Sequence, residues 1–63
     1  MKIHFTSSNS KEALSLKSKY CELYNQVNLR EADVIVAIGG DGEMLKALRL
    51  AIKNNSSVFG LNK

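Results

Sequence analysis

The sequence contains little that would place this protein in an oxidising compartment or in a membrane. Among its 63 residues there is one cysteine, Cys21, so no internal disulfide can form. No apolar segment follows Met1 as it does in a secretory signal, and no apolar run reaches the length of a membrane span. We therefore expect a cytoplasmic protein with no membrane partner.

Clustered charge of one sign is also missing. Nine lysines and arginines oppose six aspartates and glutamates, so the formal net charge is +3. This mild basicity suits small polyanions such as nucleotides. It falls short of the basic patch of a nucleic-acid-binding protein, and no aromatic residues interleave with the charges. We expect small-molecule nucleotides, and no nucleic acid, as partners.

The chain is short for the fold that its pattern predicts. A domain of this size buries only about 60% of the surface of its unfolded chain. A parallel sheet normally needs cover on both faces, which a few strands and two helices cannot provide well. We therefore interpret residues 1–63 as the N-terminal part of a larger α/β nucleotide-binding domain, or as one face of an oligomer.

Strand and helix patterns alternate along the chain. Residues 2–6 alternate between apolar and polar, 34–38 form a continuous apolar run typical of a doubly buried strand, and 58–62 indicate a third strand. Helical patterns lie between the strands, and residues 26–32 are compatible with either a short extended piece or a helical turn. This order predicts a doubly wound parallel sheet with right-handed crossovers.

Apolar stripes define the two predicted helices. Asn9 and Glu12 have the spacing of an N-cap and an N3 residue, so the first helix should begin there and end near Asn25. Its stripe consists of Ala13, Leu16, Tyr20 and Leu23. The stripe of the second helix consists of Leu45, Leu48 and Ile52, with Ala51 beside them. Stripes of this kind normally face the core of a globular protein.

Residues 34–45 carry the strongest functional signal. The apolar run ends in Gly39-Gly40-Asp41-Gly42, and a helix-forming stretch follows at once. This pattern of strand, tight turn and helix start places the Asp41 carboxylate at the carboxyl end of a strand, where open α/β sheets bind ligands. The glycines permit close approach of the backbone, and the free amides of the helix start favour an anion, either a phosphate or Asp41 itself.

The turn matches neither of the two common phosphate-binding fingerprints. The P-loop pattern is absent, and Leu45 stands where a dinucleotide fingerprint needs its third glycine. Asp41 would also repel a pyrophosphate. It suits phosphoryl transfer instead, either accepting the proton of an attacking hydroxyl or holding a metal that bridges phosphates. The alternative is a plain loop in which Asp41 caps the next helix.

The segment Ala32–Gly42, followed by Met44-Leu45 and later by Gly60-Leu61-Asn62, resembles the N-terminal domain of the NAD kinases. Diacylglycerol kinases, sphingosine kinases and 6-phosphofructokinases share the Gly-Gly-Asp-Gly turn, whereas the last block is similar to the Gly-Ile-Asn of NAD kinases. The resemblance implies transfer of a phosphoryl group from ATP, or in some members polyphosphate, to the 2′-hydroxyl of the adenosine ribose of NAD. It also implies a divalent cation, Mg²⁺, as cofactor, and NADP as product.

The resemblance further implies roles for individual residues. Asp41 would take the proton from the ribose hydroxyl and, with Gly42, contact NAD. Lys46 matches a basic residue that contacts the nucleotide, and Asn62 matches the asparagine of the last block. The implied nucleotide-binding residues are Gly39, Gly40, Asp41, Gly42, Lys46 and Asn62. No residue is implied as a metal ligand.

Glu43 departs from the family pattern, because many members have threonine or another uncharged residue there. Its carboxylate could weaken donor binding, pair with Lys46 at i+3, or simply favour the helix start. The family's downstream Asn-Glu/Asp motif and C-terminal β-rich domain are absent from residues 1–63. We therefore expect catalysis only in the complete protein, which we expect to be a homo-oligomer. The alternatives are a lipid kinase of the same superfamily and a non-catalytic nucleotide-binding fragment.

Overall fold

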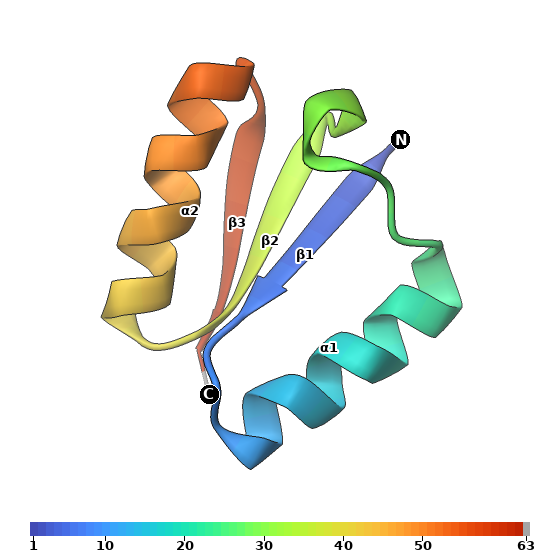
Figure 1. The fold of residues 1–63 in the computed structure, drawn as a ribbon, viewed down its shortest axis with the longest axis vertical. Coiled ribbons are helices and arrows are strands. Elements are labelled where there is room, and N and C mark those ends of the chain that lie inside the picture. The colour runs from blue at the N-terminus through green and yellow to red at the C-terminus, as the bar shows by residue number, and fades with distance from the viewer. Residues whose placement is uncertain (63) are drawn as a thin grey trace.

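The computed structural model describes residues 1–62, in which strands and helices alternate (Figure 1). The elements are β1 (Ile3–Ser7), α1 (Lys11–Tyr24), a 3₁₀ turn η1 (Leu29–Glu31), β2 (Val34–Gly39), α2 (Asp41–Asn54) and β3 (Ser57–Asn62). This alternation confirms the predicted α/β class. Each strand also begins within one residue of its predicted start.

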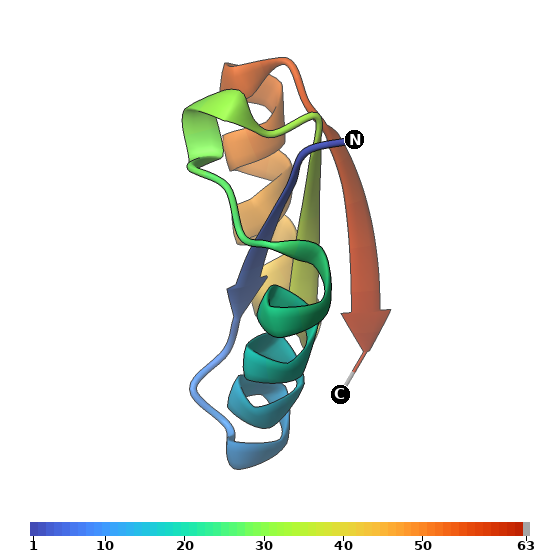
Figure 2. The same cartoon turned by 90° about the vertical axis from the view of Figure 1, so that its right-hand side faces the viewer.

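β2 is the central strand of a three-stranded parallel sheet with the order β1-β2-β3. Val36 lies in register with Phe5 on β1 and with Phe59 on β3. The residues of β2 from Ile35 to Gly39 are all buried, as its continuous apolar run predicts. The arrows of β1 and β3 point the same way in Figure 2, so the carboxyl ends of the strands meet at one edge of the sheet.

The two helices cover opposite faces of this sheet. On one face, Ile35 and Ala37 of β2 pack against α2. On the other face, Val36 and Ile38 of β2 form a core with Phe5 of β1 and with residues of α1. In Figure 1, α2 accordingly lies on one side of the strands and α1 on the other. The sheet is therefore doubly wound, as predicted.

The prediction that both crossovers are right-handed is wrong. Both connections step in the same direction across the sheet, from β1 to β2 and from β2 to β3. Two right-handed connections in one direction would place both helices on the same face. Because α1 and α2 pack on opposite faces, the two connections have opposite hands and one of them is left-handed.

The segment that enters β2 shows how the chain reaches the second face. The N–H of Val27 donates to the carbonyl of Ile3 at 3.2 Å, so the chain after α1 runs along the free edge of β1. Val27 and Leu29 then pack into the core on the α2 side. Of the two interpretations left open for residues 26–32, the helical turn is correct over Leu29–Glu31. The chain thus passes around the edge of β1.

The N-cap of α1 is Ser10, so the prediction of Asn9 was wrong by one residue. Ser10 Oγ accepts a hydrogen bond from the backbone N–H of Ala13 at 3.2 Å, which is the geometry of a side-chain cap. The predicted stripe begins correctly at Ala13, which is fully buried. Its last member, Leu23, is 62% exposed. The helix ends at Tyr24, close to the predicted end.

The buried face of α2 also differs from the prediction. Leu45 and Ile52 are 59% and 80% exposed, and Leu48 is exposed as well, whereas Ala47 and Ala51 are buried. The helix packs directly against the sheet, and an alanine permits that close approach where a leucine would hold the helix away. In residues 1–62 the most apolar stripe of α2 therefore lies on its outer face.

Candidate functional site

The turn between β2 and α2 places its glycines at the carboxyl edge of the sheet. Gly39 has a φ of +148°, and a Cβ there would lie 2.9 Å from Ser8 Oγ, so another residue would be strained and would collide with the loop after β1. A Cβ on Gly40 or Gly42 would meet nothing within 4 Å. The fold therefore requires glycine at position 39, whereas Gly40 and Gly42 leave open space beside the start of α2.

Asp41 is the first residue of α2, and its carboxylate is not used to hold the fold together. Gly40 occupies the N-cap position, and no side chain caps the helix. Within residues 1–62 the Asp41 carboxylate makes no hydrogen bond or ion pair, and the residue is exposed. The interpretation of Asp41 as a helix cap is therefore wrong, and its carboxylate is available for a ligand.

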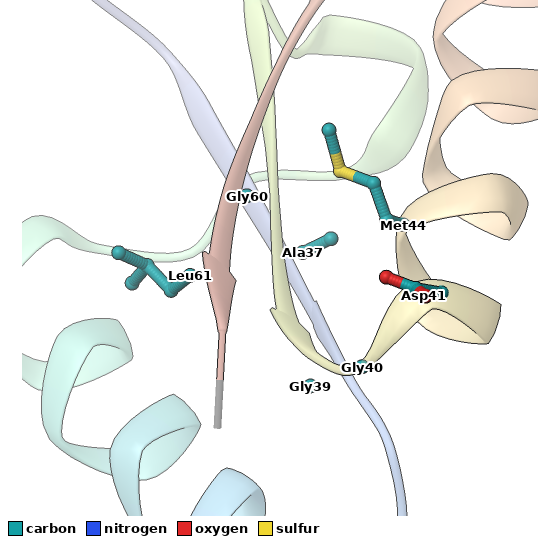
Figure 3. Close-up of a pocket in the computed structure, with 7 residues that line it drawn as sticks. All are labelled: Ala37, Gly39, Gly40, Asp41, Met44, Gly60 and Leu61. Carbon is teal, nitrogen blue, oxygen red and sulfur yellow. The ribbon is translucent and has the colours of Figure 1, made fainter.

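Asp41 borders a pocket of about 220 Å³ between α2, β2 and β3 (Figure 3). The lining residues are Ala37, Gly39, Gly40, Asp41, Met44, Gly60 and Leu61. Figure 3 shows the Asp41 side chain directed from the start of α2 toward the strands. Among the residues that the structure describes, Asp41 is the one charged group of this lining.

The inner wall of the pocket is formed by Met44 and Gly60. The Met44 Sδ would lie 2.9 Å from a Cβ at Gly60, so this glycine lets the methionine pack directly on β3. In the sequence, Met44 and Gly60 stand out only through the family resemblance. The signal that could have found this contact is the glycine inside an otherwise apolar strand, which often marks a close approach.

The structure gathers half of the predicted nucleotide-binding residues in the pocket lining. Those residues are Gly39, Gly40 and Asp41. Gly42 and Lys46 are exposed and lie outside the lining. The backbone of Asn62 is in register with Gly39, while the Asn62 side chain lies outside the described part of the structure. The roles predicted for Gly42, Lys46 and Asn62 stay predictions.

Glu43 is not among the residues that line the pocket. Its Cβ would be 3.3 Å from a Cβ on Gly39, at the same spot that Ser8 approaches from the loop after β1. Glu43 Oε2 is buried and has no hydrogen-bond partner within residues 1–62. Glu43 and Lys46 form no ion pair in this part of the chain, so the pairing considered from their spacing is not present.

Residues 1–62 contain no group of three or more His, Cys, Asp and Glu side chains that could hold a metal ion. Mg²⁺ is commonly bound by one or two carboxylates together with substrate phosphates and water. An exposed Asp41 carboxylate at the mouth of a pocket fits this kind of binding, in which substrate phosphates and water supply the other ligands. It does not form a metal site by itself.

The fold and the site together define a class of protein. A glycine-flanked carboxylate stands at the carboxyl edge of a parallel sheet, beside the free amides at the start of a helix. Ligands of α/β proteins bind at this edge, and helix amides of this kind bind anions. This arrangement is typical of α/β domains that bind a phosphorylated ligand next to a free carboxylate.

Comparison with known proteins finds similarity to proteins named NAD kinase. The chain is 44% identical over 61 residues to an NAD kinase of Brucella suis, covering 97% of this chain and 24% of the relative. It is 36% identical over 62 residues to an NAD kinase of Caulobacter vibrioides, covering 98% of this chain and 24% of the relative. With an NAD kinase of Zymomonas mobilis the identity is 51% over 43 residues, 65% of this chain and 17% of the relative.

These matches confirm the resemblance to the NAD kinase family, and this chain corresponds to the N-terminal part of its members. The chain spans about a quarter of the length of the curated relatives that it matches along nearly its whole length. No family model matches the chain. No solved structure matches it significantly.

Proposed function

We propose that the complete protein is an NAD kinase, which transfers a phosphoryl group from ATP to the 2′-hydroxyl of the adenosine ribose of NAD and forms NADP. The observation that carries this proposal is similarity along 97% of this chain to proteins named NAD kinase. The position of Asp41 supports it, because an uncommitted carboxylate lies where the ligands of α/β sheets bind. Since the matching relatives carry the NAD kinase name, the lipid-kinase alternative is not favoured.

The proposed chemistry assigns the proton transfer to Asp41. A carboxylate with no competing hydrogen bond can accept the proton of the attacking ribose hydroxyl as the new P–O bond forms. The first amides of α2 have no partner within the helix and point toward the same edge, so they would stabilise the oxygens of the transferring group. The open space beside Gly40 and Gly42 would let those oxygens approach the backbone.

Mg²⁺ would neutralise negative charge on the donor phosphates when it is bound. Asp41 is the one pocket-lining residue in the described chain that could be a ligand, so the other ligands would be phosphate oxygens and water. The site does not decide by itself between ATP and polyphosphate as donor, because the phosphates of both would meet the same turn.

The pocket is too small to hold both substrates without the rest of the protein. Its volume is about 220 Å³, whereas pockets for small molecules are commonly about 300–1,000 Å³. The proposed function therefore requires substrate-binding groups beyond residues 1–63, which the predicted C-terminal β-rich domain would supply. We expect residues 1–63 alone to be inactive, which the non-catalytic alternative predicts as well.

No helix in residues 1–62 is long and apolar enough to cross a membrane. We propose a cytoplasmic homo-oligomer whose ligands are nucleotides and which binds no nucleic acid. Sedimentation of the complete protein would test the oligomeric state.

The test of the proposed function is NADP formation from NAD, ATP and Mg²⁺ by the complete protein, with residues 1–63 assayed in parallel. Activity in the complete protein only is the expected result, because the missing part completes the site. If no common phosphoryl donor gives NADP, the proposal fails, and diacylglycerol and sphingosine should then be tried as acceptors.

A further inference from the structure

The surface of α2 that does not pack on the sheet is divided into two stripes. Three exposed apolar side chains form the apolar stripe: Leu45, Leu48 and Ile52. Three exposed cations form the basic stripe: Lys46, Arg49 and Lys53. Within each stripe the residues recur at spacings of three and four, so both stripes run along the length of the helix. The remaining side of α2, centred on Ala47 and Ala51, packs on the sheet.

The apolar stripe lies along the side of α2 that is next to β3. Leu48 follows Met44 by four residues, so their side chains lie in one row along the helix. Met44 packs on Gly60 of β3, where its Sδ would be 2.9 Å from a Cβ. Within residues 1–62, β3 is an edge strand that pairs with β2. Among the elements drawn in Figure 1, α2 is the outermost on its side of the strands.

The two stripes indicate which side of α2 faces water and which side is suited to packing. None of the three cations forms an ion pair within residues 1–62, so the basic stripe is a solvated surface. Adjacent apolar side chains that are exposed and bordered by polar residues mark an interaction site. Helix α2 therefore has two sides suited to packing, one toward the sheet and one beside β3.

The size of the apolar stripe favours a partner from the same chain over a second copy. A specific interface between two proteins buries roughly 800 Å² on each partner. Three side chains on one helix fall well short of that area. A segment of the same chain is held at a high effective concentration, so a smaller surface is enough to bind it.

The relatives of this chain are long enough to provide such a segment. The NAD kinases that match nearly all of it are about four times as long. In α/β domains, helices cover the faces of the sheet in layers and pack against one another through their side chains. The partner that suits an apolar stripe on the side of α2 is therefore another helix in the same layer.

We propose that the apolar stripe of α2 is the docking surface for a helix from the part of the complete protein beyond residue 63. This inference rests on the proposed function, because it takes the complete protein to have the length of its NAD kinase relatives. The docked helix presents apolar side chains and lies beside α2, on the side next to β3. Asp41 precedes Leu45 by four residues, so one end of the docked helix lies near the pocket that Asp41 borders.

The first test measures how fast a water-soluble maleimide labels single cysteines in the native complete protein. Ile52→Cys is the probe, because Ile52 is 80% exposed in residues 1–62. Lys53→Cys, the next residue and a member of the basic stripe, is the matched control. Mass spectrometry of the digested protein separates these sites from Cys21. We expect Ile52→Cys to react about tenfold or more slowly than Lys53→Cys, because labelling then requires local opening. In urea the two should react equally.

The second test identifies what covers the stripe. The complete protein carries p-benzoylphenylalanine in place of Ile52, and equal amounts of ¹⁵N-labelled and unlabelled protein are mixed before photo-crosslinking. The expected product joins α2 to a peptide from beyond residue 63, and both peptides carry the same isotope. Protection of Ile52→Cys should also be unchanged on dilution. Products of mixed isotope, or protection that weakens on dilution, would show that a second copy covers the stripe and would overturn the inference.

Equal labelling of Ile52→Cys and Lys53→Cys in the native protein would overturn the inference as well, because the stripe would then be open to water. Neither measurement depends on turnover, so the inference and the proposed function can fail separately. If Ile52→Cys is protected but no NADP forms, the docked helix stands and the kinase falls. If NADP forms but the two cysteines react equally, the kinase stands and the docked helix falls.

Discussion

The side-chain amide of Gln26 pairs with the backbone of Phe5 as a neighbouring strand would. The Phe5 N–H donates to Gln26 Oε1 at 2.7 Å, and Gln26 Nε2 donates to the Phe5 carbonyl at 3.1 Å. Together with the bond from Val27 to Ile3, these contacts satisfy much of the outer edge of β1. A free strand edge is a template for pairing with another chain, and this pairing closes part of it.

Gln26→Ala should therefore destabilise the complete protein and promote its self-association. The lost pair leaves a backbone donor and acceptor without partners, and we expect about 1–2 kcal/mol of lost unfolding free energy. Urea unfolding and sedimentation at several concentrations measure the two effects. Asn28→Ala, nearby and exposed, is the control. Equal behaviour of the two variants would show that the amide pairing contributes nothing.

Gly39 and Gly40 should respond differently to the same substitution. Gly39→Ala forces a Cβ against Ser8 Oγ at a positive φ, and we expect a loss of about 1–3 kcal/mol in unfolding free energy. Gly40→Ala meets open space, so stability should change little while nucleotide affinity falls. Thermal unfolding and a nucleotide titration distinguish the two. A stability loss at Gly40 equal to that at Gly39 would contradict this division.

Asp41→Asn should abolish most turnover of the complete protein and leave NAD binding largely intact. The amide keeps the shape of the side chain and loses the ability to accept a proton, and general-base catalysis typically contributes about 10²–10⁴-fold. The measurements are kcat for NADP formation and Kd for NAD. Asp33→Asn, at the opposite end of β2, is the control for loss of a carboxylate. An unchanged kcat in Asp41→Asn would contradict the assignment of Asp41 as the general base.

Lys46→Ala should weaken NAD binding if the role implied by the family resemblance is correct. Lys46 is exposed and lies outside the pocket lining. Its ammonium group would reach the nucleotide only if the side chain extended toward the pocket, or if the binding site of the complete protein were larger than this pocket. A titration with NAD measures the effect against Lys53→Ala on the same helix. Identical affinities of the Lys46→Ala and Lys53→Ala variants for NAD would mean that Lys46 is an ordinary solvent-exposed residue with no role in binding.

Ala47→Leu should destabilise the fold by about 1–3 kcal/mol, because the larger side chain must displace α2 from the sheet. Ala47 is fully buried against β2. Arg49→Leu adds the same side chain at an exposed position and should cost much less. Chemical denaturation of both variants gives the comparison. A small effect of Ala47→Leu would mean that α2 can shift outward without loss of packing.

The family resemblance and the candidate site could both be predicted from one local segment of the sequence. A continuous apolar run, the Gly-Gly-Asp-Gly turn and the helix-forming residues after it lie next to one another in the chain, so their backbone preferences alone place Asp41 at a strand end. The same holds for Gly39, because a turn residue with a positive φ favours glycine whatever the position of the rest of the chain. The buried Oε2 atom of Glu43 could not be found in this way, because burial of a side-chain atom depends on packing that the local sequence does not show.

The sequence by itself determined the order of strands and helices, the burial of β2 and the position of Asp41, because each depends on residues close together in the chain. The tertiary structure alone decided which face of α2 packs on the sheet. Periodicity favoured the leucine stripe, but close contact between a helix and a sheet selects small side chains, and Ala47 and Ala51 provide them. It also decided the opposite hands of the two crossovers, since the path of the chain around β1 depends on contacts between distant segments such as Val27 and Ile3.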